Sequence, residues 1–160
     1  MAKVTLTASR RIGIIAGLLV LLVISAVWFI QRPPSLPANI KSEVPFKAFM
    51  PTKLPNNYHI QDSSYDYQSG VLTFRIEGLD GKSILISQQP EPGNFDIGGF
   101  HDILKDKQAV ETAYGTAHIG KSENTKVGSL LTSGLWIFLS SPPSTDSEDL
   151  KTVLSHLVKT

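Results

Sequence analysis

The clearest chemical signal in the sequence is the adjacent pair His101 and Asp102. An imidazole beside a carboxylate is the combination that a general base and its orienting acid use, and it is also half of a metal site. Neighbouring strand residues point to opposite faces, however, and the four histidines are far apart, at positions 59, 101, 118 and 156. We therefore predict surface or locally hydrogen-bonded histidines, with no catalytic residue, metal site or cofactor.

Motifs that mark the common enzyme classes are absent from the chain. It contains no G-x-S-x-G, H-E-x-x-H, P-loop, G-x-G-x-x-G or calcium-loop pattern. It also contains no cysteine, which excludes disulfides, thiolate metal sites and thiol nucleophiles. These absences predict that the protein is not an enzyme. The remaining catalytic alternative is an envelope hydrolase, which needs a cleft that brings His101 or His118 near an acid and a serine.

An apolar run of nineteen residues, Ile12 to Ile30, determines where the rest of the chain is expected to lie. Its one polar side chain is Ser25. A helix of this length spans roughly 28 Å, close to the hydrocarbon thickness of a bilayer. We predict a single membrane-spanning helix, with an aromatic residue near its outer end as such helices favour. The residues taken to mark the span are Ile12, Leu18, Leu22, Trp28 and Ile30.

Charge decides the predicted orientation. Residues 1–32 carry four basic and no acidic residues, whereas residues 33–160 carry eleven basic and fourteen acidic residues. The positive-inside rule then places the N-terminus in the cytoplasm and the C-terminal part outside, at the cell membrane. Two alternatives stay open: a cleaved signal peptide, although the run ends without an A-x-A-like site, and a soluble protein that buries the segment. The spacing of Gly13 and Gly17 also permits weak self-association of the span.

Four regions follow from this reading. Residues 1–11 form a short basic cytoplasmic tail, residues 12–30 the span, residues 31–44 a proline-rich linker and residues 45–160 an extracytoplasmic domain. At the start of this domain, Pro45 to Pro55 alternates prolines with apolar residues, which predicts an irregular arm packed across it. A proline-rich ligand for another domain is the alternative interpretation of the arm.

Strand patterns dominate the rest of the chain. The first group is a loose strand over Tyr58 to Tyr67, followed by Val71 to Glu77 and Ser83 to Gln88, with the turn Asp80-Gly81 between the last two. We predict that these three strands form an antiparallel meander. A short helical turn over Phe100 to Lys105 follows the proline- and glycine-rich loop Gln89 to Gly99.

A second strand group leads to a terminal helix. Its strands are 108–113, 116–120, 126–132 and 135–140, and the last is apolar on both faces, which is typical of a covered central strand. Apolar residues then recur at helical spacing over Asp146 to Lys159, after a capping-box pattern at Thr145 and Glu148. The predicted fold class is α+β: a transmembrane helix, then an antiparallel sheet of six or seven strands with a C-terminal amphipathic helix packed on it.

The order of these features resembles a family of uncharacterised bacterial extracytoplasmic domains that follow one membrane span, as in some anti-sigma-factor-like and cell-envelope proteins. The matching features are Pro51, Leu54, Pro55 and Tyr58, the strand Gly115 to Ile119, the residues Leu135, Trp136 and Phe138, and the terminal helix. The resemblance covers residues 45–160 and implies a sensing or binding role outside the membrane. Anti-sigma activity is not implied, because Met1 to Arg11 is too short for a cytoplasmic sigma-binding domain.

The predicted partners follow from exposed apolar residues and charge. The loop Gln89 to Phe100 carries Phe95, Ile97 and Phe100 among glycines, which makes it a candidate partner-binding loop unless these residues pack back on the sheet. The mildly acidic external part does not suit nucleic acid. We predict a binding, sensory or assembly module for a protein, peptide or envelope component. The alternative is a carrier that holds an apolar ligand between sheet and helix.

Overall fold

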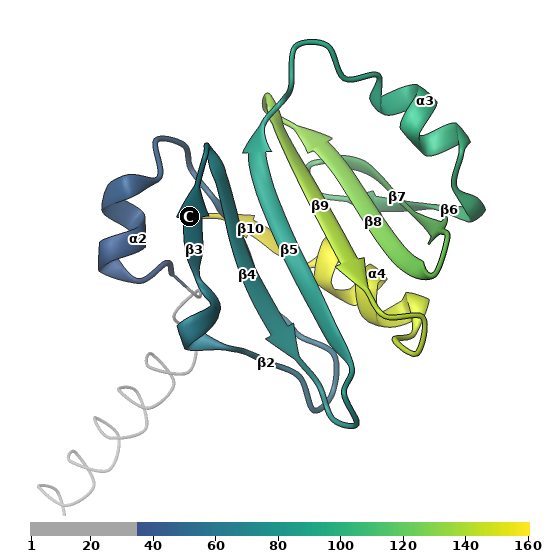
Figure 1. The fold of residues 1–160 in the computed structure, drawn as a ribbon, viewed down its shortest axis with the longest axis horizontal. Helices are drawn as coiled ribbons and strands as arrows, with labels where there is room; N and C mark the ends of the chain where they lie inside the picture. Colours follow the sequence, from purple (N-terminus) through teal and green to yellow (C-terminus); the bar gives the residue numbers. More distant parts are fainter. Residues whose placement is uncertain (1–34) are drawn as a thin grey trace, which may run out of the picture. The chain divides into compact units, whose positions relative to one another are not determined.

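The computed structural model describes residues 35–160, which form helices and antiparallel strands in an α+β arrangement (Figure 1). The elements are α2 (Ala38–Glu43), β1 (Phe49–Pro51), β2 (His59–Ile60), the 3-10 helix η1 (Asp62–Ser64), β3 (Asp66–Gln68), β4 (Val71–Glu77), β5 (Ser83–Pro90), α3 (Ile97–Asp102), β6 (Lys105–Thr112), β7 (Gly115–Ser122), β8 (Thr125–Thr132), β9 (Leu135–Ser141), α4 (Ser147–Ser155) and β10 (Leu157–Lys159).

The predicted membrane span lies outside the part of the chain that the structure describes, and so do Gly13 and Gly17. Among residues 35–160, no helix has the length and apolar character needed to cross a membrane.

The main sheet joins the two predicted strand groups. Its order is β2-β4-β5-β9-β8-β7-β6, with β3 also pairing with β4, and each neighbouring pair is antiparallel. The predicted strands 71–77, 83–88, 126–132 and 135–140 are confirmed, most of them longer by one or two residues. The turn between β4 and β5 has positive φ at Asp80 (58°) and Gly81 (74°), as a tight hairpin turn requires.

The loose strand predicted over Tyr58 to Tyr67 is wrong as one element, because η1 interrupts it between β2 and β3. The Ser64 hydroxyl donates to the Gln61 carbonyl at 2.6 Å and accepts from the Arg75 backbone N–H at 2.8 Å. A serine side chain that bonds nearby backbone competes with regular strand pairing. The edge of the sheet is therefore built from two short strands instead of one.

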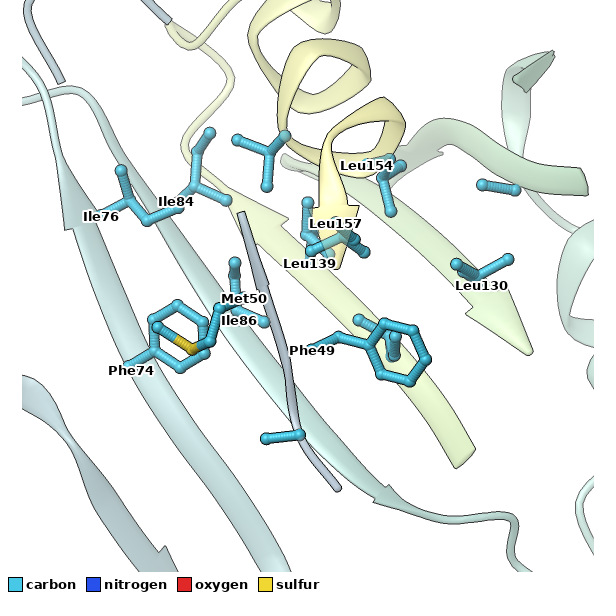
Figure 2. Close-up of a cluster of buried hydrophobic side chains, with 14 of the residues drawn as sticks. Phe49, Met50, Phe74, Ile76, Ile84, Ile86, Leu130, Leu139, Leu154 and Leu157 are labelled. Carbon is cyan, nitrogen blue, oxygen red and sulfur yellow. The ribbon is translucent and has the colours of Figure 1, made fainter. Parts of the chain in front are cut away.

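One face of the sheet carries the hydrophobic core. Figure 2 shows side chains from β4, β5 and β9 meeting those of β1, α4 and β10. Helix α4 lies directly on the sheet at Gly128, where an added Cβ would be 3.0 Å from Leu154 Cδ1. We call this face the core face; its fully buried residues include Leu72, Phe74, Ile76, Ile84, Ile86, Leu130, Ile137 and Leu139, covered by Phe49, Met50, Leu150, Val153 and Leu154.

The predicted arm is confirmed as a packed segment, and it contains the strand β1. Ala48, Phe49, Met50 and Pro51 are buried. The fully buried amide of Gln88 accepts a hydrogen bond from the Phe49 N–H and donates one to the Phe49 carbonyl, both at 2.7 Å. Gln88 thus satisfies the two backbone groups that β1 turns toward the sheet, as a neighbouring strand would.

The C-terminal helix is shorter than predicted. The pattern predicts a helix to Lys159, but α4 ends at Ser155, and Leu157 to Lys159 form β10, paired with β1. The predicted capping box is also wrong, because the N-cap is Asp146 and its side chain makes no capping bond. Leu157 fits the helical spacing but lies in a strand, where it is buried. Apolar spacing alone does not distinguish a last helical turn from a strand, and backbone pairing with the arm decides it.

The predicted linker differs from the structure over part of its length. Residues 38–43 form α2, and Leu36 and Ile40 are buried in the core at 8% and 7% exposure. Pro37 precedes the first helical residue, where its fixed φ suits a helix start. The packed domain therefore begins at about residue 36 instead of residue 45.

Candidate functional site

The face of the sheet opposite α4 carries a second set of large side chains. Because side chains alternate along a strand, Trp136 and Phe138 point away from the core face on which Ile137 and Leu139 lie. The strand register places His118 of β7 beside Ser129 of β8, and Ser129 beside Phe138 of β9, on this same outer face. The central strand β9 is thus apolar on both faces, as its sequence predicts.

A single segment, residues 91–104, covers the part of this outer face that is formed by β7, β8 and β9. Its helix α3 begins at the N-cap Asp96, whose carboxylate accepts a hydrogen bond from the Gly99 N–H at 3.0 Å. The predicted helical turn over Phe100 to Lys105 is displaced, because the Asp96 cap starts the helix earlier, at Ile97. At the end of the segment, Leu104 is buried over Gly120, where an added Cβ would be 2.8 Å from Leu104 Cβ.

Aromatic rings hold this segment to the sheet. Phe95 lies over Trp136 with ring centroids 4.4 Å apart, and Phe100 contacts both Trp136 (6.0 Å) and Phe138 (5.9 Å). The Trp136 indole N–H donates to the Ser129 hydroxyl at 2.8 Å, which orients the indole. We call the resulting group the outer cluster: Phe95, Phe100, His101, His118, Trp136 and Phe138.

Two imidazoles complete the outer cluster. The rings of His101 and His118 are stacked with centroids 4.1 Å apart and planes tilted by 40°. His101 Nε2 and His118 Nδ1 are buried and have no hydrogen-bond partner. The prediction of surface or locally bonded histidines is therefore wrong for these two. It is correct for the exposed His59 and for His156, whose Nδ1 is 2.8 Å from the Thr152 carbonyl.

The surroundings of His101 disfavour its charged form. Burial lowers the pKa of His101 from its ordinary value, and His118 and Lys107 lower it further, while Asp102 opposes them. The Lys107 ammonium lies 3.0 Å from the Asp102 carboxylate, and this hydrogen bond holds the pKa of Asp102 below its usual range. One buried nitrogen on each histidine is therefore without a hydrogen-bond partner among residues 35–160.

The arrangement does not contain the parts of a hydrolytic site. In residues 35–160 neither His101 nor His118 is hydrogen-bonded to a serine or to a carboxylate, and Ser129 is engaged by Trp136. The Asp102 carboxylate instead accepts a hydrogen bond from the Lys107 ammonium. No group of three or more histidine, aspartate or glutamate side chains in this described region is placed to hold a metal ion. What the cluster offers is apolar surface with two unpaired nitrogens.

The predicted loop residues lie at this cluster. Phe95 and Phe100 pack back on the sheet and are half-buried, and Ile97 at the start of α3 is also half-buried. Ile103, at the other end of α3, is 70% exposed. The segment is therefore both a cover for the sheet and an exposed apolar surface. The predicted span residues Ile12 to Ile30 lie outside the described region.

Sequence reasoning missed the partnership of His101 with His118 and the role of Trp136. The two histidines are seventeen positions apart, with the strand β6 between them, so no local spacing connects them. The one available signal was the strand pattern itself. Once β6 to β9 are aligned as a meander, His118 and Trp136 fall on the same face, opposite the core.

Comparison with protein families, with curated proteins and with solved structures finds no match to this chain. The function must therefore be argued from the outer cluster and the sequence alone.

Proposed function

We propose that this protein is a single-pass membrane protein whose residues 35–160 act outside the membrane as a binding module for a protein, peptide or envelope component, without catalytic activity. The anchoring part of the proposal rests on the apolar run Ile12 to Ile30 and its basic flank. The binding part rests on the outer cluster.

The observation that carries the binding role is the pair of buried, unpartnered nitrogens beneath an apolar cover. An unsatisfied buried polar atom costs about 1–3 kcal/mol, so such atoms usually have a partner in the working protein. Ile97 at the start of α3 and Ile103 directly after its end present apolar surface. A partner that lies over α3 gains from apolar contact, and one that displaces part of the cover can also supply hydrogen bonds to His101 and His118.

The alternative role as a carrier of an apolar ligand needs space between the sheet and α4. The close approach of Leu154 to Gly128, and the complete burial of Leu150 and Val153, favour the binding module over the carrier. A hydrolase is disfavoured because, among residues 35–160, neither stacked histidine is hydrogen-bonded to a serine or to a carboxylate.

Site-specific photocrosslinking in cells tests the binding surface. A photoreactive amino acid at Ile97 of the full chain should give a discrete adduct with one partner. The same residue at Leu79, which is 62% exposed on the β4–β5 turn, is the matched control and should give none. Adducts at Leu79 without adducts at Ile97 would remove the outer cluster as the binding surface.

Topology is tested separately, and the absence of cysteine makes this direct. A Leu79→Cys variant should react with a membrane-impermeant maleimide on intact cells, because residue 79 lies outside in the proposed orientation. Labelling that appears only after lysis would reverse the orientation and overturn the extracytoplasmic location.

A further inference from the structure

A second feature, distant from the outer cluster, lies where the chain enters the domain. Leu36 and Ile40 are already part of the core, so the domain is fixed to the chain from residue 36 onward. The predicted span ends at Ile30, which leaves residues 31–35 as the spacer. At about 3.1 Å per residue for extended proline-rich chain, this spacer reaches roughly 15–20 Å. In the anchored protein that we propose, a spacer of this reach allows the surface around α2 to contact the lipid headgroups.

A groove of about 400 Å³ opens at this surface. Its apolar lining includes Leu36, Val44 and Phe46. Phe46 is kept in place by an edge contact with Tyr67, with ring centroids 6.3 Å apart. The groove thus has a fixed apolar wall beside Leu36, at the side where the chain enters the domain.

All charged side chains that line the groove are basic. Lys41, on the last turn of α2, and Lys47 line it, and no aspartate or glutamate does. Thr160 also lines the groove. Its backbone N–H donates to the Ala48 carbonyl at 2.9 Å, so Thr160 is held beside the arm. Neither lysine forms an ion pair within residues 35–160.

We propose that this groove binds the phosphate headgroup of an anionic phospholipid in the membrane that anchors the chain. Lys41 and Lys47 contact the phosphate, and the glycerol and first methylenes lie against Leu36, Val44 and Phe46. The inference rests on the anchoring part of the proposed function. Modest intrinsic affinity is enough, because a short tether holds the groove at a high effective concentration of headgroups. The contact fixes the orientation of the domain on the membrane.

The experiment uses the full chain reconstituted in vesicles of phosphatidylcholine, with or without phosphatidylglycerol. The vesicles also carry a trace of phosphatidylcholine bearing a nitroxide on its headgroup. Since the chain has no cysteine, Pro45→Cys places one fluorophore at the exposed rim of the groove. Ile103→Cys places the control fluorophore beyond α3, which Figure 1 shows at the opposite end of the domain from α2.

The nitroxide should quench the fluorophore at residue 45 about twofold or more above that at residue 103, and phosphatidylglycerol should increase the difference. Lys41→Glu with Lys47→Glu should remove this increase. Lys105→Glu with Lys151→Glu, an equal charge change at two other exposed lysines, should keep it. Equal quenching at residues 45 and 103, or an increase that survives Lys41→Glu with Lys47→Glu, overturns the groove proposal.

Extraction with alkaline carbonate separates this failure from failure of the anchoring proposal. A chain that carbonate releases from membranes has no span, and both proposals then fall. A chain that is retained but shows no headgroup quenching at residue 45 overturns the lipid contact alone.

Discussion

The two faces of the sheet are closed in different ways. On the core face, α4, β1 and β10 cover fully buried aliphatic side chains, and even the polar Gln88 has both of its amide groups bonded. On the outer face, one segment with a helix of six residues covers half-buried aromatic rings and leaves two imidazole nitrogens unpaired. Both faces carry an apolar cluster, but the cluster on the core face is fully covered and satisfied, whereas the outer cluster is not.

This difference distinguishes the face that stabilises the fold from the face that we propose for binding. A closed apolar core supplies most of the favourable free energy of folding, whereas a lightly covered surface opens at a lower cost. Because a few aromatic contacts hold the cover of the outer cluster, we expect the cover to detach without unfolding of the core. The following variants test that separation, beginning with the largest expected effect.

Neighbouring residues of β9 give the sharpest comparison, because Leu139 faces the core and Phe138 faces the outer cluster. Leu139→Ala should lower the free energy of unfolding by about 2–5 kcal/mol, since it leaves a cavity among fully buried side chains. Phe138→Ala should cost less, because the ring is half-buried. Chemical denaturation measures both, and an equal or larger loss for Phe138→Ala would contradict the distinction between the faces.

Substitution of Gln88 tests whether the stability of the core face also depends on its buried hydrogen bonds. Gln88→Leu leaves the N–H and carbonyl of Phe49 buried without partners and should cost about 2–4 kcal/mol in chemical denaturation. Its neighbour Gln89 lies on the outer face, paired with Trp136, so Gln89→Leu is the matched control and should change stability little. Similar losses for both variants would show that the Gln88 bonds are not what holds β1.

Phe100→Ala tests the attachment of the outer cover. The ring contacts Trp136 and Phe138, so its loss should cost about 1–2 kcal/mol and should be felt mainly by residues 91–104. Hydrogen exchange should accelerate at amides of α3 while β4, β5 and β9 keep their protection. Faster exchange throughout the sheet would mean that the two faces unfold as one.

The smallest effect is a pH dependence confined to the outer cluster. The pKa of His101 is lowered in the folded protein by burial, with His118 and Lys107 adding to this and Asp102 opposing it. The unfolded chain therefore binds the proton more readily. Stability of the cover is complete above about pH 6.5, the ordinary pKa, and falls as the pH drops from there through the lowered pKa.

Trp136 reports this change directly in a Trp28→Phe background, because the chain has two tryptophans. Its fluorescence should shift on acidification below about pH 6.5, and His101→Phe should remove the shift while keeping a ring against His118. An unaltered shift in His101→Phe would assign the pH dependence to another group.

Most strands and their turns could be predicted from the sequence, because alternation and residues such as Asp80-Gly81 act over a few neighbouring positions. The β5–β9 junction between the two groups could not, since it joins residues about fifty apart along the chain. The helical pattern near the C-terminus was misleading for the same reason. Leu157 satisfies helical spacing, but pairing of β10 with β1, more than a hundred residues away, makes it a strand residue.

By itself, the sequence determined the α+β class, the packed arm and the doubly covered central strand, because period and composition encode local conformation and burial. It also supports a membrane span, through the length of one uncharged run. Only the tertiary structure decided that His101 stacks on His118, that Gln88 closes the core and that Leu36 begins the domain. Those three depend on strand register and on contacts between distant segments, which no local pattern specifies.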